Sequence, residues 1–251
     1  MSDQGAVGNG NDAGTSPALP LFYKNPRPVN REVHENKSVK QERNFAFAAD
    51  TNSIPIAASE FPAAAANYPI LFTSGEPAAP IALLGLERGQ NLFVSDGKWA
   101  QGCYVPAYAR RYPFIFSDVP GNDQLALCID EESGFLEDGD ANPIFIDGEP
   151  SEQLKTALTF CEHFQRDFTL TSAFSSALSE AGLLAQKEMT YNSQDGQRVG
   201  LTGFRVVDEK KLNELPDETF LEWRKKGWLA PIYAHLLSIS NVSALAVRRG
   251  M

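Results

Sequence analysis

The sequence predicts an α+β fold in one domain, with a strand-rich N-terminal two-thirds and a helical C-terminal part. Short apolar runs bounded by Gly, Pro, Asn or Asp dominate the chain up to residue 147, which is typical of strands joined by turns. After Pro150 the apolar residues recur at helical spacing instead. This change is a shift in composition without a flexible linker, so we expect one domain over residues 19–249.

The first segments of the chain are read from small local patterns. Residues 1–18 are small and polar with almost no apolar anchor, so we expect a disordered tail. The run Leu19–Tyr23 predicts a strand or extended arm that ends in a turn. Phenylalanine alternates with alanine at residues 45–47, which predicts a strand. Pro55 lies between two isoleucines at residues 54–56, which favours an edge strand. The Ala-rich stretch Ser59–Asn67 predicts a short helix with a proline in its first turn.

The middle of the chain is expected to be mostly extended. Val105–Tyr112 predicts one or two helical turns within it. Strands are expected at five apolar runs: Ile70–Thr73, Ile81–Leu86, Asn91–Val94, Phe114–Phe116 and Leu125–Ile129.

The C-terminal part begins with the clearest amphipathic pattern, a helix over 151–168 capped by Ser151. A second helix is expected over Ala173–Leu184. Two strand-like runs on either side of Asp195-Gly196 predict a hairpin. Further helices are expected at 217–226, at Trp228–Ser240 and after residue 241.

Composition excludes several classes of function. The net charge is −10 and the pI is about 4.8, which argues against binding to nucleic acid or to an anionic lipid surface. The N-terminus lacks the pattern of a secretory signal, and no apolar run is long enough to span a membrane, so we expect a cytoplasmic protein without membrane insertion. Three isolated cysteines, Cys103, Cys128 and Cys161, fit a reducing compartment and predict small buried side chains.

The acidic residues are concentrated in one segment. Ten Asp and Glu residues lie between 123 and 152, where no Lys or Arg occurs. Either a solvated acidic loop or a docking surface for a basic partner would explain this segment. An EF-hand-type spacing starts at Asp138, but Pro143 stands where the loop needs glycine. We therefore expect no metal site, and no cofactor motif is present.

A cluster of aromatic and arginine residues is the best candidate for ligand binding, because Tyr and Arg anchor many binding sites. The alternatives are packing at the edge of the core and under loops, and pairing of Arg110 or Arg111 with the acidic segment. The candidate ligand-binding residues are Trp99, Tyr104, Tyr108, Arg110, Arg111 and Tyr112.

Catalysis is not indicated by any local motif. Of the three histidines, His163 is expected on a helix surface and His235 in the core. An enzyme with a dispersed site is the alternative, with His34, Glu60 and Arg111 as candidate catalytic residues, if the fold brings them together.

Several strings together give the chain a resemblance to the SapC family of bacterial proteins over roughly residues 19–249. They include Phe22-Tyr23-Lys24, Pro28-Val29-Asn30-Arg31, Tyr68-Pro69-Ile70, Arg111-Tyr112-Pro113-Phe114, Cys128-Ile129-Asp130, Gly203-Phe204 and His235-Leu236-Leu237-Ser238.

The resemblance implies a link to surface-layer loci or to loci for TonB-dependent uptake. It supplies no catalytic residues. We therefore expect a cytoplasmic accessory or ligand-binding protein whose partner is an unknown protein or small molecule. The alternatives are an enzyme that modifies an amino acid or peptide, and an exported surface-layer component.

Overall fold

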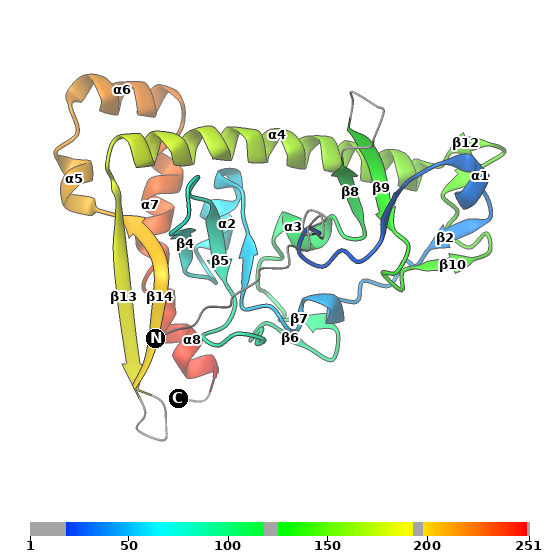
Figure 1. The fold of residues 1–251 in the computed structure, drawn as a ribbon, viewed down its shortest axis with the longest axis horizontal. Helices are drawn as coiled ribbons and strands as arrows, with labels where there is room; N and C mark the ends of the chain where they lie inside the picture. Colours follow the sequence, from blue (N-terminus) through cyan, green and yellow to red (C-terminus); the bar gives the residue numbers. More distant parts are fainter. Residues whose placement is uncertain (1–18, 118–124, 193–197, 250–251) are drawn as a thin grey trace, which may run out of the picture.

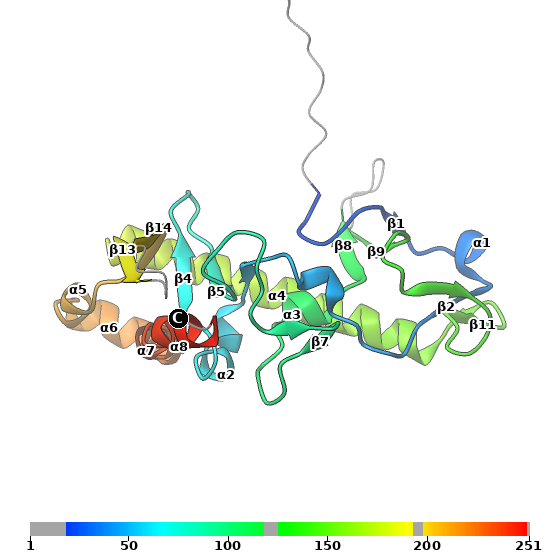
Figure 2. The same ribbon diagram turned by 90° about the horizontal axis from the view of Figure 1, so that it is seen from below.

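The fold is built along one long helix, α4 (Glu152–Glu180), in a computed structural model that describes residues 19–117, 125–192 and 198–249. Its 29 residues give a length of about 43 Å at 1.5 Å per residue. Ser151 caps it, accepting a hydrogen bond from the Leu154 amide at 3.2 Å. The helix runs along most of the length of the molecule, and most of the strands lie below it in the view of Figure 1 (Figure 1, Figure 2). The fold class predicted from the sequence, α+β, is confirmed; the expected tail 1–18 lies outside the described residues.

The prediction of two helices over 151–184 was wrong, because α4 runs through both without a break. Neither Gly nor Pro occurs between Ser151 and Ala181, so nothing in this stretch excludes helical backbone. The hydroxyl of Thr171 donates to the Asp167 carbonyl within the helix. The helix ends at Gly182, whose φ of 65° is the left-handed conformation that glycine adopts readily.

A five-stranded antiparallel sheet lies against one half of α4, in the order β13-β14-β4-β5-β3. The predicted edge strand is confirmed, because β3 lies at one edge of this sheet. The predicted hairpin is confirmed by the antiparallel pair β13 and β14, whose connecting turn lies outside the described residues. The strands are β3 (Ser53–Pro55), β4 (Ile70–Thr73), β5 (Pro80–Leu83), β13 (Leu184–Asn192) and β14 (Arg198–Val207).

Smaller sheets lie along the other half of α4 and near its middle. One has the order β1-β9-β8, and three are two-stranded pairs: β2 with β10, β11 with β12, and β6 with β7. Their strands are β1 (Pro26–Pro28), β2 (Lys37–Val39), β6 (Val94–Ser95), β7 (Lys98–Trp99), β8 (Phe114–Ser117), β9 (Ala126–Asp130), β10 (Leu136–Asp138), β11 (Phe145–Ile146) and β12 (Glu149–Pro150).

Short helices lie between and after these strands, and three strand predictions were wrong. The strand expected at Asn91–Val94 is mostly a turn that leads into β6. Leu19–Tyr23 forms turns, and 45–47 leads into a 3₁₀ helix, η1 (Ala46–Ala48), in place of a strand. This turn puts Phe45 against Trp99 and Phe47 against Tyr112, at ring distances of 5.5 and 4.3 Å. The other short helices are α1 (Arg31–His34), η2 (Ala58–Glu60), α2 (Phe61–Ala64), α3 (Ala107–Arg110), α5 (Glu209–Asn213), α6 (Asp217–Lys225), α7 (Leu229–Ser238) and α8 (Asn241–Arg248).

His235 on α7 is the polar centre of the main core, as expected from the sequence. Its Nδ1 donates to the Ile70 carbonyl at 2.8 Å, and its Nε2 accepts from the Val207 amide at 3.0 Å. Burial lowers the pKa of this histidine to about 4, so the ring is neutral and can play both roles. The imidazole therefore fixes α7 to β4 and β14.

Within the described residues, no single helix is long and apolar enough to cross a membrane. Helices α7 and α8 reach the length and apolar composition of a membrane span only when they are counted together, and they are bent by 42° relative to each other.

Candidate functional site

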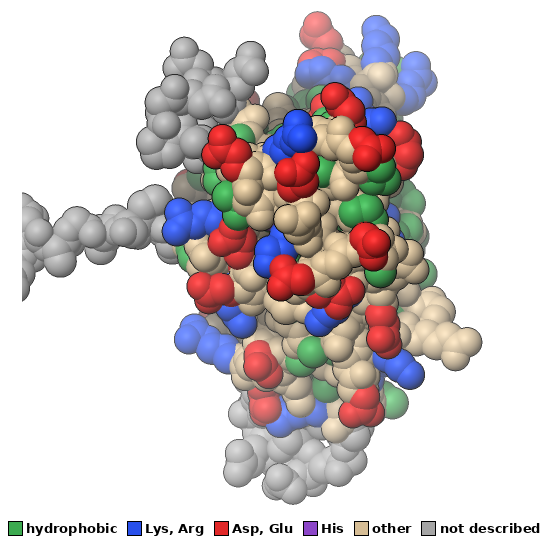
Figure 3. All heavy atoms as spheres, turned by 90° about the vertical axis from the view of Figure 1, so that its right-hand side faces the viewer, with side chains coloured by type: hydrophobic (Ala, Val, Ile, Leu, Met, Phe, Trp, Pro, Cys, Tyr) green, Lys and Arg blue, Asp and Glu red, His purple; other side chains and the backbone are tan. Residues whose placement is uncertain are grey.

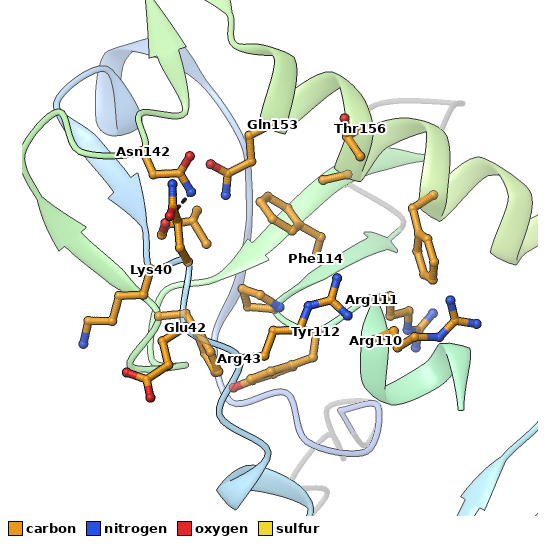
Figure 4. A pocket seen from close by; sticks show the side chains of 16 residues that line it. Lys40, Glu42, Arg43, Arg110, Arg111, Tyr112, Phe114, Asn142, Gln153 and Thr156 are labelled. Atoms are coloured by element: carbon orange, nitrogen blue, oxygen red, sulfur yellow. Dashed lines mark hydrogen bonds between the residues drawn. The ribbon is translucent and has the colours of Figure 1, made fainter. Parts of the chain in front are cut away.

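The feature that best fits a binding function is a cleft of about 420 Å³, here called the arginine cleft. Its walls include the end of β2 with the loop after it (residues 39–43), the stretch 110–114 from α3 into β8, and the first part of α4 (Figure 4). Ligand pockets for small molecules usually have volumes of about 300–1,000 Å³. The cleft is therefore large enough for a small organic molecule.

The lining of the arginine cleft is strongly cationic although the protein is acidic. Lys40, Arg43, Arg110 and Arg111 line it, and Glu42 is the one acidic lining residue. None of the four cations lies within 4 Å of a carboxylate in the part of the chain that the structure describes. The lining of the cleft therefore keeps a net positive charge in a chain whose net charge is −10.

Arg111 is the most deeply placed of these cations, with only 8% of its surface exposed. Its guanidinium carbon lies 4.2 Å from the ring centre of Tyr108 and 4.1 Å from that of Phe164. Aromatic faces stabilise a guanidinium group held between them, which explains how a buried cation is tolerated here. The Arg111 Nε is nevertheless buried without a hydrogen-bond partner among the described residues. A buried charged donor without an acceptor is costly, so this atom is suited to an anionic ligand.

Arg110 is held in place by a chain of hydrogen bonds that begins at Glu60. The Glu60 carboxylate accepts from the Tyr104 hydroxyl at 2.8 Å and from the Ala107 amide at 2.7 Å. Arg110 donates in turn to the Tyr104 hydroxyl at 3.0 Å and to the Val105 carbonyl at 2.9 Å. Burial, together with the charge of Glu60, raises the pKa of Tyr104 to about 12, so its hydroxyl remains a donor at neutral pH.

A second, smaller cleft of about 270 Å³ adjoins the first along α4. Arg110 and Phe160 line both clefts, and the guanidinium carbon of Arg110 lies 5.3 Å from the Phe160 ring centre. Glu60 and Tyr104 line this smaller cleft only. The two arginines predicted from the sequence thus share the arginine cleft, while Tyr104 supports it from behind.

The remaining residues of the predicted aromatic cluster have structural contacts. Tyr112 lines the arginine cleft and donates to Asp130 at 3.0 Å, and Tyr108 contacts Arg111 with its ring. Burial raises the pKa of both tyrosines. Trp99 lies in the core, where its indole donates to the Tyr68 hydroxyl at 2.8 Å.

The three candidate catalytic residues occupy different places. His34 lies on α1 at one end of the molecule, where its Nε2 is 3.4 Å from a Glu131 carboxylate oxygen. Glu60 lies beside α2 and Arg111 follows α3, both nearer the middle of α4 (Figure 1). No contact joins His34 to Glu60 or Arg111 in the described ranges, so the fold does not assemble these residues into one site.

The acidic segment is largely exposed and forms part of the end of the molecule around β10, β11 and β12. Acidic side chains are spread over this end among Lys and Arg (Figure 3). Asp130 is the exception: it is fully buried and accepts from the Lys24 and Asn25 amides as well as from Tyr112. Neither Arg110 nor Arg111 pairs with a described carboxylate of this segment.

Most residues of the arginine cleft were missed by reasoning from the sequence, and Arg43 and Gln153 are the two that matter most for binding. Arg43 lies in a loop with no recognisable motif, and Gln153 lies in the first turn of α4. The only available signal was the basic character of Lys37–Arg43, which contrasts with the acidic chain. Their proximity to Arg110 and Arg111 arises from long-range packing, which a local pattern does not reveal.

The fold and the site define the class of this protein: it is an α+β protein with a preformed cationic cleft. The SapC family profile matches residues 29–245, so the chain belongs to the SapC family. Searches for similar proteins found no match among curated proteins or among solved structures.

Proposed function

We propose that the protein is a cytoplasmic accessory protein that binds an organic anion in the arginine cleft. The observation that carries the proposal is Arg111, a buried cation that lines the cleft and whose Nε has no acceptor among the described residues. Arg43 and Arg110 add charge on the same walls, and none of the three has a carboxylate partner among the described residues. A carboxylate or a similar planar anion matches the geometry of a guanidinium donor.

The apolar part of the lining favours an organic ligand over a simple inorganic ion. Phe114, Phe135 and Phe160 line the same cleft as the arginines. Small-molecule sites commonly combine apolar and aromatic walls with a few oriented polar groups. A carboxylate attached to an apolar or aromatic body would use both kinds of wall.

The cytoplasmic location and the accessory role rest on different support. Three free cysteines are compatible with a reducing compartment, and two of them are buried. Membership of the SapC family supports a role linked to surface-layer or nutrient-uptake loci. Fractionation of the source bacterium tests the location: recovery in the cytosol supports the proposal, whereas recovery in the surface layer would overturn it.

Calorimetric titration with 3-phenylpropionate tests the binding site, with the uncharged 3-phenylpropanamide as the matched probe. The native protein should bind the carboxylate and bind the amide at least tenfold more weakly. Arg111→Met replaces the guanidinium group with an uncharged, unbranched side chain. This variant should bind the carboxylate at least tenfold more weakly. Arg166→Gln, an exposed change on α4 outside the cleft, is the control and should bind normally. Equal affinities for acid and amide would contradict the proposal.

A further inference from the structure

We infer that the ligand of the arginine cleft carries a hydrogen-bond donor at the end of its apolar body opposite the anion. This inference rests on the proposed function and narrows the class of ligand. It follows from a second buried polar atom in the same cleft, which is an acceptor and not a donor.

That atom is the side-chain oxygen of Gln153. It is buried and has no hydrogen-bond partner among the described residues. Gln153 lines the arginine cleft, as does Asn142. The Asn142 Nδ2 donates to the Val39 carbonyl at 2.8 Å, and the Asn142 oxygen, unlike that of Gln153, is not a buried atom without a partner. Gln153 is therefore the amide whose oxygen is left for a ligand.

The acceptor lies at the opposite end of the cleft from two of the four cations, Arg110 and Arg111. Figure 4 shows Gln153 and Asn142 on one side and Arg110 and Arg111 on the other, with Phe114 between them. Along α4, Gln153 precedes Phe160 by two turns, and the Phe160 ring lies against Arg110. Seven residues of helix span about 10 Å, so the two ends are separated by the length of a small aromatic molecule.

The two unpartnered atoms have complementary requirements. Arg111 Nε needs an acceptor, and Gln153 Oε1 needs a donor. A ligand with only an anionic group would leave the Gln153 oxygen buried and unsatisfied, which is unfavourable. A carboxylate joined through an aromatic or apolar body to a hydroxyl or N–H group satisfies both atoms. Hydroxylated or amino-substituted aromatic acids belong to this chemical class.

Three probes of similar shape test the inference by titration of the full-length protein. They are 3-(4-hydroxyphenyl)propionate, 3-phenylpropionate and 3-(4-methoxyphenyl)propionate. The hydroxyl compound should bind about five- to tenfold more tightly than the other two, because only it can donate to Gln153. Gln153→Leu should abolish this preference, so that the three probes bind the variant with affinities within about twofold of one another. The matched control, Gln165→Leu, changes an exposed glutamine of α4 and should keep the preference.

Failure of the inference differs from failure of the proposed function. If the native protein binds all three probes equally, or if the preference survives in Gln153→Leu, the inference is overturned while the anion site stands. If none of the probes binds, the proposed function fails, and the inference fails with it.

Discussion

The carboxylate of Glu60 and the guanidinium of Arg110 are joined through a single atom, the hydroxyl oxygen of Tyr104. The hydroxyl donates to Glu60 at 2.8 Å and accepts from Arg110 at 3.0 Å. Glu60 itself is 7% exposed and also accepts from the Ala57 and Ala107 amides. A residue proposed as a catalytic candidate from the sequence is thus a support for the wall of the arginine cleft.

Replacing Glu60 with alanine should lower the free energy of unfolding by about 2–3 kcal/mol, because three donors lose a charged acceptor. Chemical denaturation of the native and variant proteins measures this change. Glu222→Ala is the control, since it removes an exposed carboxylate paired with Lys226 and should cost less than about 1 kcal/mol. Equal losses in the two variants would show that Glu60 does not hold this wall together.

His235 should make the stability of the protein depend on pH. Burial lowers the pKa of His235 from 6.5 to about 4, so the unfolded chain binds the proton more readily than the native protein. Its contribution is fully present above pH 6.5 and is lost as pH falls from 6.5 to 4, by about 3 kcal/mol in total.

Urea denaturation at several pH values measures this slope. His235→Gln should be less stable at pH 7 and should show a shallower decline toward pH 4. His163→Gln, on the exposed surface of α4, should leave the slope as in the native protein. A native-like slope in His235→Gln would assign the pH dependence to other groups.

Arg43→Gln should weaken binding of 3-phenylpropionate about three- to fivefold without changing the melting temperature. Arg43 is exposed and forms no ion pair within the described ranges, so the fold does not depend on it. Binding should also weaken as salt rises from about 0.05 to 0.5 M, because ions screen the attraction of exposed charges. If neither the Arg43→Gln substitution nor the rise in salt alters the affinity, 3-phenylpropionate binds outside the arginine cleft.

The three thiols should react at different rates in the native protein. Cys103 is partly exposed, whereas Cys128 and Cys161 are buried, and burial raises the pKa of Cys161 to about 11. Iodoacetamide should therefore modify Cys103 at least tenfold faster than the other two, as measured by peptide mass spectrometry. All three should react at similar rates in denaturant, and early labelling of Cys161 in the native protein would contradict this burial.

Local patterns predicted much of the fold because the relevant residues are neighbours in sequence. The predicted boundaries of β4, Ile70–Thr73, match the structure. The helix cap at Ser151 and the edge position of β3 were each predicted from a single residue. The strand expected at 45–47 failed because alternation does not exclude a 3₁₀ turn that places both phenylalanines against distant rings. Propensity was overridden there by tertiary packing.

The site was only partly accessible to sequence reasoning. Arg110, Arg111 and Tyr112 are consecutive, so the cluster could be recognised as a candidate. Arg43 and Gln153 come from segments about 70 and 40 residues away and join them only through long-range packing. The missing hydrogen-bond partners of Arg111 and Gln153 are visible only once burial is known.

The most direct test of an organic-anion site is the NMR signal of the Arg111 Nε–H group, assigned by its loss in Arg111→Met. Titration with 3-phenylpropionate should shift this signal until it saturates, because the unpartnered Nε gains an acceptor. The dissociation constant from this shift should equal the one measured by calorimetry. The uncharged 3-phenylpropanamide should leave it almost unchanged at the same concentrations. An Arg111 signal that stays fixed while the carboxylate binds would contradict the site.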